Sequence, residues 1–213
     1  MLVFLSYQTK DKLIAGRIAA FFESIGIETF LAHENIKVTQ RWQEAILDNL
    51  SKMDIFVAIV SDNYCDSDYC LQESGVAMLR ANDITIAPLS LDDTVPPGFM
   101  SHIQAAKIDG KTIDRSMLFS IVANQDVGLA IDHLIDRLSN SKSYAEAERR
   151  FEMLSPYLGH ADKTQIINLL KAGASNSQIW ACWACQPSLR ALLKSHGKFL
   201  SKKDREDLAE KLS

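Results

Sequence analysis

The feature that most constrains the fold is a nearly unbroken apolar run at Asp54–Val60, Asp-Ile-Phe-Val-Ala-Ile-Val. A strand with one face in water alternates apolar and polar residues, whereas a strand covered on both faces is apolar throughout. The run therefore predicts a central strand of a parallel sheet with helices on both sides. Its surroundings agree, because short apolar runs alternate with stretches of helical periodicity over the first 138 residues.

Five predicted strands alternate with helices in this region. The strands are Leu2–Ser6, Ile27–Leu31, Asp54–Val60, Ile84–Leu89 and Ala105–Ile108. The helices are Lys12–Ser24, Arg41–Leu50, Tyr69–Arg80 and Gln125–Leu138. This alternation predicts an α/β domain with a five-stranded, parallel, doubly wound sheet of the flavodoxin-like kind. Such sheets bind ligands beyond the carboxyl ends of their strands, so we expect the functional site there.

The rest of the sequence shows no strand pattern and predicts a small all-α domain. Its expected helices are Tyr144–Leu154, Asp162–Ala172, Asn176–Ala184, Pro187–Ser195 and Lys202–Leu212. A short polar run at 138–143 has the composition of a linker, which gives expected domains of 1–138 and 143–213. The second domain has only a modest excess of Lys and Arg, so we expect an assembly or regulatory role and no nucleic-acid partner.

We expect a cytoplasmic protein with neither a membrane partner nor a metal site. No apolar run approaches the ~18 residues of a membrane span. Met1–Leu5 runs into a strand without the basic segment and cleavage site of a signal peptide. In that compartment the cysteines are expected to be free thiols. Cys182-Trp183-Ala184-Cys185 lies in a helical pattern and the histidines show no ligand spacing, which disfavours a zinc site.

Missing motifs exclude several classes of α/β enzyme. Neither G-x-G-x-x-G nor G-x-x-x-x-G-K follows the first strand, so a standard Rossmann dehydrogenase or P-loop NTPase is not expected. Serine hydrolases and zinc peptidases are excluded because G-x-S-x-G and H-E-x-x-H are absent. A response-regulator receiver is disfavoured, since Asp62 comes late after its strand and no acidic pair follows the first strand.

Three stretches, in the same order and spacing, resemble the TIR (Toll/interleukin-1 receptor) family. Phe4–Tyr7 resembles the family's first box. Phe30–Ile36, followed by Trp42–Ile46, resembles its second strand, its BB loop and the next helix. Ser61–Tyr64 and then Ser67–Glu73 resemble the exit of the third strand and the helix that bears the family's catalytic glutamate. The resemblance covers the first domain and does not extend to the second.

The resemblance implies an NAD⁺ glycohydrolase or cyclase of the bacterial type, with NAD⁺ as its substrate and no further cofactor. Glu73 would be the catalytic carboxylate. Tyr69, where enzymatic members usually carry Trp, would contact the substrate. The other substrate-binding residues would be Ser6, Tyr7, Gln8 and Glu34.

The resemblance also implies self-association as the activating event. The contacts would be formed by TIR surfaces that include the BB loop, here Ala32–Arg41. Members of this kind deplete NAD⁺ in immune, antiviral or cell-death responses. Whether the product is ADP-ribose or a cyclic isomer is left open.

The chemistry can work with one carboxylate. Nicotinamide leaves a pyridinium as a neutral molecule, so it needs no proton from an acid, unlike the leaving group of an ordinary glycosidase. An ionised carboxylate beside the ribose would stabilise its oxocarbenium charge. A free Glu has a pKa of about 4.3, so we expect Glu73 to be ionised. We also expect it to point away from its helix's apolar face, which consists of Leu71, Gly75, Met78 and Leu79.

Two other functions stay open. A non-enzymatic TIR scaffold would keep the fold and the BB loop. It is favoured by Tyr69 in place of Trp and by Gln8 where some members have Arg, whereas Glu73 favours the enzyme. A nucleoside 2-deoxyribosyltransferase would also use a Glu near a strand exit, but it would process nucleosides and leave NAD⁺ untouched.

Overall fold

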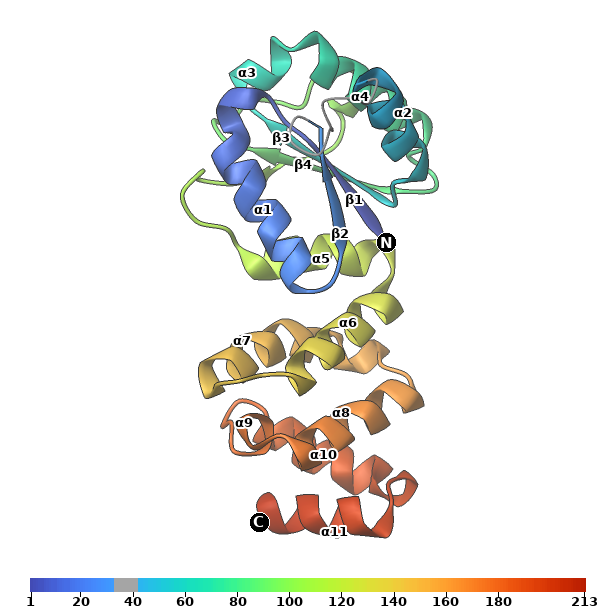
Figure 1. Cartoon of the computed structure of the whole chain (residues 1–213), viewed down its shortest axis with the longest axis vertical. Helices are drawn as coiled ribbons and strands as arrows, with labels where there is room; N and C mark the ends of the chain where they lie inside the picture. The colour runs from blue at the N-terminus through green and yellow to red at the C-terminus, as the bar shows by residue number, and fades with distance from the viewer. Residues whose placement is uncertain (33–41) are drawn as a thin grey trace. The chain divides into compact units, whose positions relative to one another are not determined.

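The computed structural model describes residues 1–32 and 42–213, without the side chain of Trp42. The chain forms two compact units, Met1–Gln125 and Asp126–Ser213 (Figure 1). The sequence placed the end of the first domain at residue 138, after one more helix. That helix, α6 (Val127–Ser139), packs against α7 (Tyr144–Leu154) and α8 (Lys163–Ser175), so it belongs to the second compact unit.

A five-stranded, all-parallel sheet forms the centre of the first unit, which confirms the predicted fold class. Its strands are β1 (Leu2–Ser6), β2 (Glu28–Leu31), β3 (Ile55–Val60), β4 (Thr85–Ser90) and β5 (Ala106–Lys107). They lie in the order β2-β1-β3-β4-β5. The strand order reverses at β1, since β2 lies on one side of β1 and the later strands lie on the other. In doubly wound sheets ligands bind at this switch point, here between β1 and β3.

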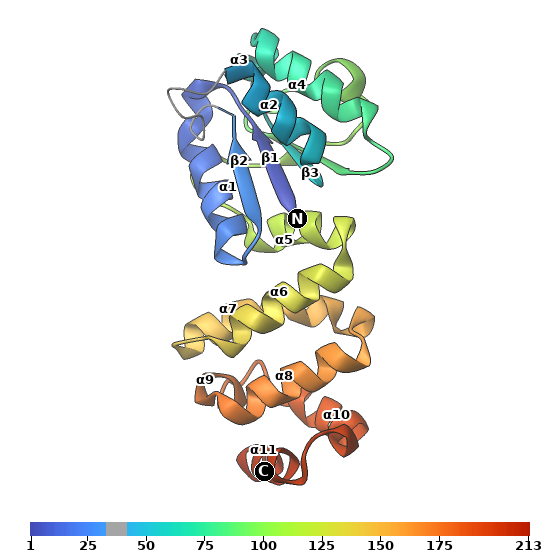
Figure 2. The ribbon, with the colours of Figure 1, turned by 45° about the vertical axis from the view of Figure 1, so that its right-hand side comes forward.

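Helices cover both faces of the sheet. They are α1 (Lys12–Ser24), α2 (Trp42–Lys52), α3 (Asp62–Cys65), α4 (Asp68–Leu79) and α5 (Arg115–Gln125), with 3₁₀ turns η1 (Thr9–Asp11) and η2 (Gly98–Met100). α1 and α5 lie on one face, and α2 and α4 lie on the other (Figures 1 and 2). The sequence analysis missed α5, although Asp114 caps it by accepting a hydrogen bond from the Met117 amide at 3.0 Å.

Successive side chains of β1 point to opposite faces of the sheet, so every second residue packs against the same layer of helices. Phe4 belongs to the buried cluster between the sheet and the α2–α4 layer. Its ring centroid lies 5.2 Å from that of Phe30 and 5.8 Å from that of Phe56. Side chains two residues apart on a strand share a face, so Ser6 also projects toward α4.

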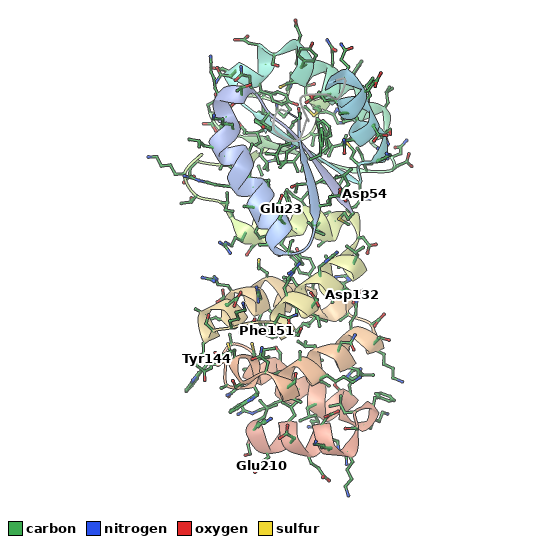
Figure 3. The ribbon with its side chains drawn as sticks, in the orientation of Figure 1. Glu23, Asp54, Asp132, Tyr144, Phe151 and Glu210 are labelled. Carbon is green, nitrogen blue, oxygen red and sulfur yellow. The ribbon has the colours of Figure 1, made fainter. Side chains whose placement is uncertain are left out.

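The second unit contains helices and no strand, as predicted, although the predicted helix Asn176–Ala184 extends only over Ser177–Trp180. Besides α6, α7 and α8 it contains α9 (Ser177–Trp180), α10 (Gln186–His196), α11 (Lys202–Lys211) and the 3₁₀ turns η3 (Ser155–His160) and η4 (Gly197–Phe199). Phe151 is buried among these helices, whereas Tyr144 is exposed (Figure 3). All four cysteines of the chain are free thiols. None of the helices in residues 1–32 and 42–213 has the length and apolarity that crossing a bilayer requires.

Candidate functional site

Helix α4 buries a face that the sequence analysis assigned to solvent. Its buried residues are Cys70, Glu73, Ser74 and Ala77. Glu73 is 4% exposed and Leu79 is 88% exposed, so the prediction that Glu73 points away from the core is wrong. The apolar periodicity was misleading because the residues that face the strand ends are small or polar, and the larger apolar ones lie outside.

Only one of the two oxygens of the Glu73 carboxylate has a hydrogen-bond partner among the described residues. Its Oε2 accepts a hydrogen bond from Ser6 Oγ, at the end of β1, over 2.5 Å. Its Oε1 is buried and has no hydrogen-bond partner among the residues that the structure describes. Leaving a buried acceptor unpaired costs about 1–3 kcal/mol, and a charged group costs more. Native proteins therefore contain few unpaired buried acceptors. An arrangement of this kind points to a ligand.

Burial shifts the acidity of Glu73. Desolvation raises its pKa from 4.5 to about 7, against the opposing effect of the Ser6 hydrogen bond. The expectation that this residue is fully ionised near neutrality is therefore wrong, because burial penalises the charged form. A positively charged ligand placed nearby would restore the ionised state.

A pocket of about 270 Å³ lies between α2 and α4. It is lined by Gln43, Ile46, Leu47, Leu50, Tyr69, Gln72, Glu73 and Val76. Glu73 is the single carboxylate among these lining residues, and none of them is a Lys, Arg or His. Apolar walls around one buried acid with a spare oxygen suit a cationic ring.

A larger groove of about 790 Å³ lies in the second unit, among α6, α8 and α11. It carries several aspartates and lysines, but none of its lining side chains is a buried polar group without a partner. Size alone does not mark a site. The smaller pocket is the better candidate because an unsatisfied carboxylate lines it.

The structure brings together three of the predicted site residues. Ser6 contacts Glu73 directly, and Tyr69 lines the same pocket one helical turn earlier, 43% exposed. Tyr7 is fully buried, and Gln8 Oε1 accepts a hydrogen bond from the Lys10 amide over 2.6 Å, within its own turn.

Glu34 and residues 33–41 of the expected BB loop lie outside the described residues. The substrate-binding roles proposed for the individual side chains therefore stay predictions.

The sequence analysis missed the wall of the pocket that α2 provides. Ile46 and Leu50 belong to the buried cluster beneath this helix, and both also line the pocket. Leu47 is an apolar side chain that is 57% exposed. An apolar residue outside the core-facing stripe of α2 was the one available sign that this helix serves more than the core.

A family model described as the TIR domain matches residues 3–118. The chain belongs to the TIR family. The uncharacterized protein YddK of Bacillus subtilis (strain 168) is 28% identical over 108 residues, which span 48% of this chain and 38% of that protein. A probable 2′ cyclic ADP-D-ribose synthase, BdTIR of Brachypodium distachyon, is 33% identical over 85 residues, spanning 40% of this chain and 35% of that protein. The TIR unit thus matches well under half the length of either relative.

A solved structure is also similar to this TIR unit. It is the TIR domain of the Toll-related receptor TRR-2 from Hydra magnipapillata, with a TM-score of 0.43 and 17% identity. The match covers 49% of this chain and 82% of that one.

Proposed function

We propose that the TIR unit cleaves the nicotinamide–ribose bond of NAD⁺, by hydrolysis or by cyclisation. The observation that carries the proposal is the buried Glu73 carboxylate, whose Oε1 is unpaired among the described residues in a largely apolar pocket. The Brachypodium relative supports it, because that protein is described as a probable cyclic ADP-ribose synthase.

The charge of the substrate fits the state of Glu73. The nicotinamide ring of NAD⁺ is a pyridinium, and a cation beside the carboxyl group lowers its pKa and favours its ionised form. As the glycosidic C–N bond breaks, its electron pair goes to the departing neutral nicotinamide. The positive charge then develops on the ribose, where the carboxylate stabilises it. Capture by water releases one proton and gives ADP-ribose, whereas capture by an atom of the same molecule gives a cyclic product.

The size of the pocket limits which part of the substrate it holds. Sites that enclose a drug-sized ligand usually measure about 300–1,000 Å³. A pocket of about 270 Å³ therefore suits the nicotinamide riboside end, with the adenosine diphosphate part lying outside it. Tyr69, partly exposed in the pocket wall, would stack on the nicotinamide ring.

The setting of this activity is part of the same proposal. Activation by self-association through TIR surfaces, including Ala32–Arg41, and a role in immune or cell-death responses rest on the family resemblance.

A non-enzymatic scaffold is the second candidate, and a surface feature favours it. Leu79 of α4 and Phe99 of η2 are 88% and 77% exposed, and both line one open hollow of about 450 Å³. Exposed apolar side chains that gather in this way are typical of protein–protein contacts. A scaffold would use this surface and leave NAD⁺ intact.

The deciding experiment follows nicotinamide release from NAD⁺ by the full chain, with chromatographic identification of the products. Wild type, Glu73→Gln and Glu28→Gln are compared in dilute solution and at high protein concentration. Glu28 is the matched control because it is exposed and lies at the start of β2, at the opposite end of the strands from Ser6. A nucleoside panel in parallel tests for 2-deoxyribosyl transfer.

We expect wild type and Glu28→Gln to release nicotinamide at equal rates. Glu73→Gln should be slower by a factor on the order of 100 or more, as for other single preorganised electrostatic contacts. Equal rates in all three proteins would remove Glu73 from the mechanism. If none releases nicotinamide, even at high concentration, the scaffold becomes the better account.

A further inference from the structure

A chain of hydroxyl groups lies behind the Glu73 carboxylate. Ser6 Oγ, which donates to Glu73, is also 3.0 Å from the hydroxyl oxygen of Tyr64. That tyrosine oxygen is in turn 2.8 Å from Ser74 Oγ and 3.3 Å from the Cys70 carbonyl oxygen. All of these side chains are buried, and Ser6 and Tyr64 are completely so.

A count of protons gives this chain a direction. Each serine or tyrosine hydroxyl has one proton to donate, and an ionised carboxylate has none. When Glu73 is ionised, Ser6 must donate to it, so the contact between Ser6 and Tyr64 requires the tyrosine to donate. Ser74 then donates either to the tyrosine oxygen at 2.8 Å, which continues the chain, or to the Cys70 carbonyl at 2.7 Å. The contact of 3.3 Å between the Tyr64 hydroxyl and that carbonyl competes for the one tyrosine proton and is the longest of the set. Successive donors that point the same way strengthen one another.

The chain joins three separate elements at the switch point of the sheet. Ser6 ends β1, Tyr64 lies in α3 directly after β3, and Glu73 and Ser74 belong to α4. Tyr64 is itself held in place, because its amide donates to Ser61 Oγ at 3.2 Å. A shift of any one element would move the hydroxyl that holds Glu73.

The titratable side chains of Tyr64 and Cys70 are neutral near pH 7. Burial raises the pKa of Tyr64 far above its usual range and that of Cys70 to about 11. From the α2 side, the pocket residues Gln43, Ile46, Leu47 and Leu50 are uncharged. Among the residues that the structure describes, Asp11 of η1 is a charged group nearby on another element, and it accepts a hydrogen bond from Ser61 Oγ at 2.7 Å.

We propose that Tyr64 is a positioning residue for the reaction, holding the Ser6 hydroxyl toward Oε2 of Glu73 so that Oε1 stays directed to the substrate. The inference rests on the proposed function, because positioning has a consequence only if Glu73 acts on a ligand. It assigns to Tyr64 and Ser74 a role beyond filling the core.

The test uses Tyr64→Phe, which keeps the buried ring and removes only its hydroxyl. Thr29→Val is the matched control, because Thr29, near the start of β2, also has a buried hydroxyl, which donates to Glu23 Oε1 at 2.9 Å. The kinetics of nicotinamide release are measured from pH 5.5 to 8.5 for both variants and wild type. Thermal unfolding of each protein reports any loss of folded protein.

Tyr64→Phe should lower kcat/KM by about tenfold, the upper range for losing one hydrogen bond. The pH below which its kcat/KM falls, the acid limb of the profile, should move upward, because the ionised form of Glu73 is then less well stabilised. Thr29→Val should leave both quantities unchanged. Wild-type kinetics and an unmoved acid limb in a folded Tyr64→Phe protein would overturn the proposal. If that variant does not fold, Ser74→Ala replaces it, with an expected fall of roughly two- to threefold in the same direction.

A second readout separates this inference from the proposed function. If wild type cleaves no NAD⁺, the proposed function fails, and the carboxyl resonance of Glu73 is followed instead by carbon NMR over the same pH range. Glu73→Gln identifies that resonance. A higher midpoint in Tyr64→Phe than in wild type would support the positioning chain, and an identical midpoint would overturn it.

Discussion

The two units of the chain each bury a long polar side chain on a helix, and they treat it differently. Gln165 of α8 is 6% exposed, and both ends of its amide are used. Its Nε2 donates to the Gly128 carbonyl at 2.8 Å, and its Oε1 accepts from the Asp162 amide at 3.0 Å, within a capping box. Glu73 of α4 is 4% exposed, and one of its two oxygens has no partner among the described residues.

The contrast is the one expected between a structural role, at Gln165, and the functional role proposed for Glu73. A buried polar group with all its partners ties neighbouring elements together and contributes to stability. A buried carboxylate left half-satisfied costs stability, and it persists where the same group is needed for a ligand. We therefore expect replacement of Glu73 to stabilise the TIR unit and replacement of Gln165 to destabilise the helical unit.

The largest expected effect on stability is a gain in Glu73→Gln at alkaline pH. The folded-state pKa of Glu73, about 7, lies above its ordinary value of 4.5, so the folded protein binds this proton more tightly. The resulting stabilisation is complete below about pH 4.5 and is lost as the pH rises through about 7. The loss amounts to about 3 kcal/mol at pH 8, and Glu73→Gln avoids it.

Hydrogen exchange in urea at pH 5 and pH 8, observed on peptides of β1 and β3, measures this difference. The exposed Glu28→Gln substitution is the control and should show no advantage at either pH. If Glu73→Gln is less stable than wild type at pH 8, the carboxylate makes a net favourable contribution to stability, and the contrast with Gln165 disappears.

A smaller effect of opposite sign is expected at Gln165. Gln165→Met keeps the length of the side chain but leaves the Gly128 carbonyl and the Asp162 amide without their partner. This should destabilise the second unit by about 2 kcal/mol, equally at pH 5 and pH 8, since no charge is involved. Exchange on peptides of α8 measures it, and nicotinamide release should not change.

Gln178→Met is the control for that substitution, because Gln178 is only partly buried on α9. Its effect should stay within about 0.5 kcal/mol, as for most surface changes. A Gln165→Met protein as stable as wild type would mean that its two hydrogen bonds contribute nothing, which would remove the structural half of the comparison.

Much of the fold could be predicted from the sequence, because buried parallel strands leave a strong apolar signal. The predicted strand Asp54–Val60 corresponds to β3, Ile55–Val60, and the predicted helix Lys12–Ser24 is α1. The short helix α3 was missed because its four residues are too few to show a helical period. The boundary between the units was placed later because α6 has the periodicity of any amphipathic helix, and its packing partners come afterwards in the chain.

The site was predicted less completely, because its central residue is a buried acid. The resemblance pointed to Glu73, but periodicity assigned its side chain to solvent because a buried acid breaks the rule by which helix faces are recognised. Its raised pKa follows from that burial, so it could not be foreseen. Tyr64 and Ser74 come from different elements, and only the folded chain brings the Tyr64 hydroxyl to Ser6 and the Ser74 hydroxyl to Tyr64.

The most direct test of the central claim is the pH dependence of kcat/KM for nicotinamide release by the wild-type chain. This quantity reports ionisations of the free enzyme. Since the free protein holds Glu73 with a pKa of about 7, kcat/KM should rise through a single ionisation near that pH and level off above it. Activity that stays constant down to pH 5.5 would contradict the account, because the reacting group would then not be a buried, half-satisfied carboxylate.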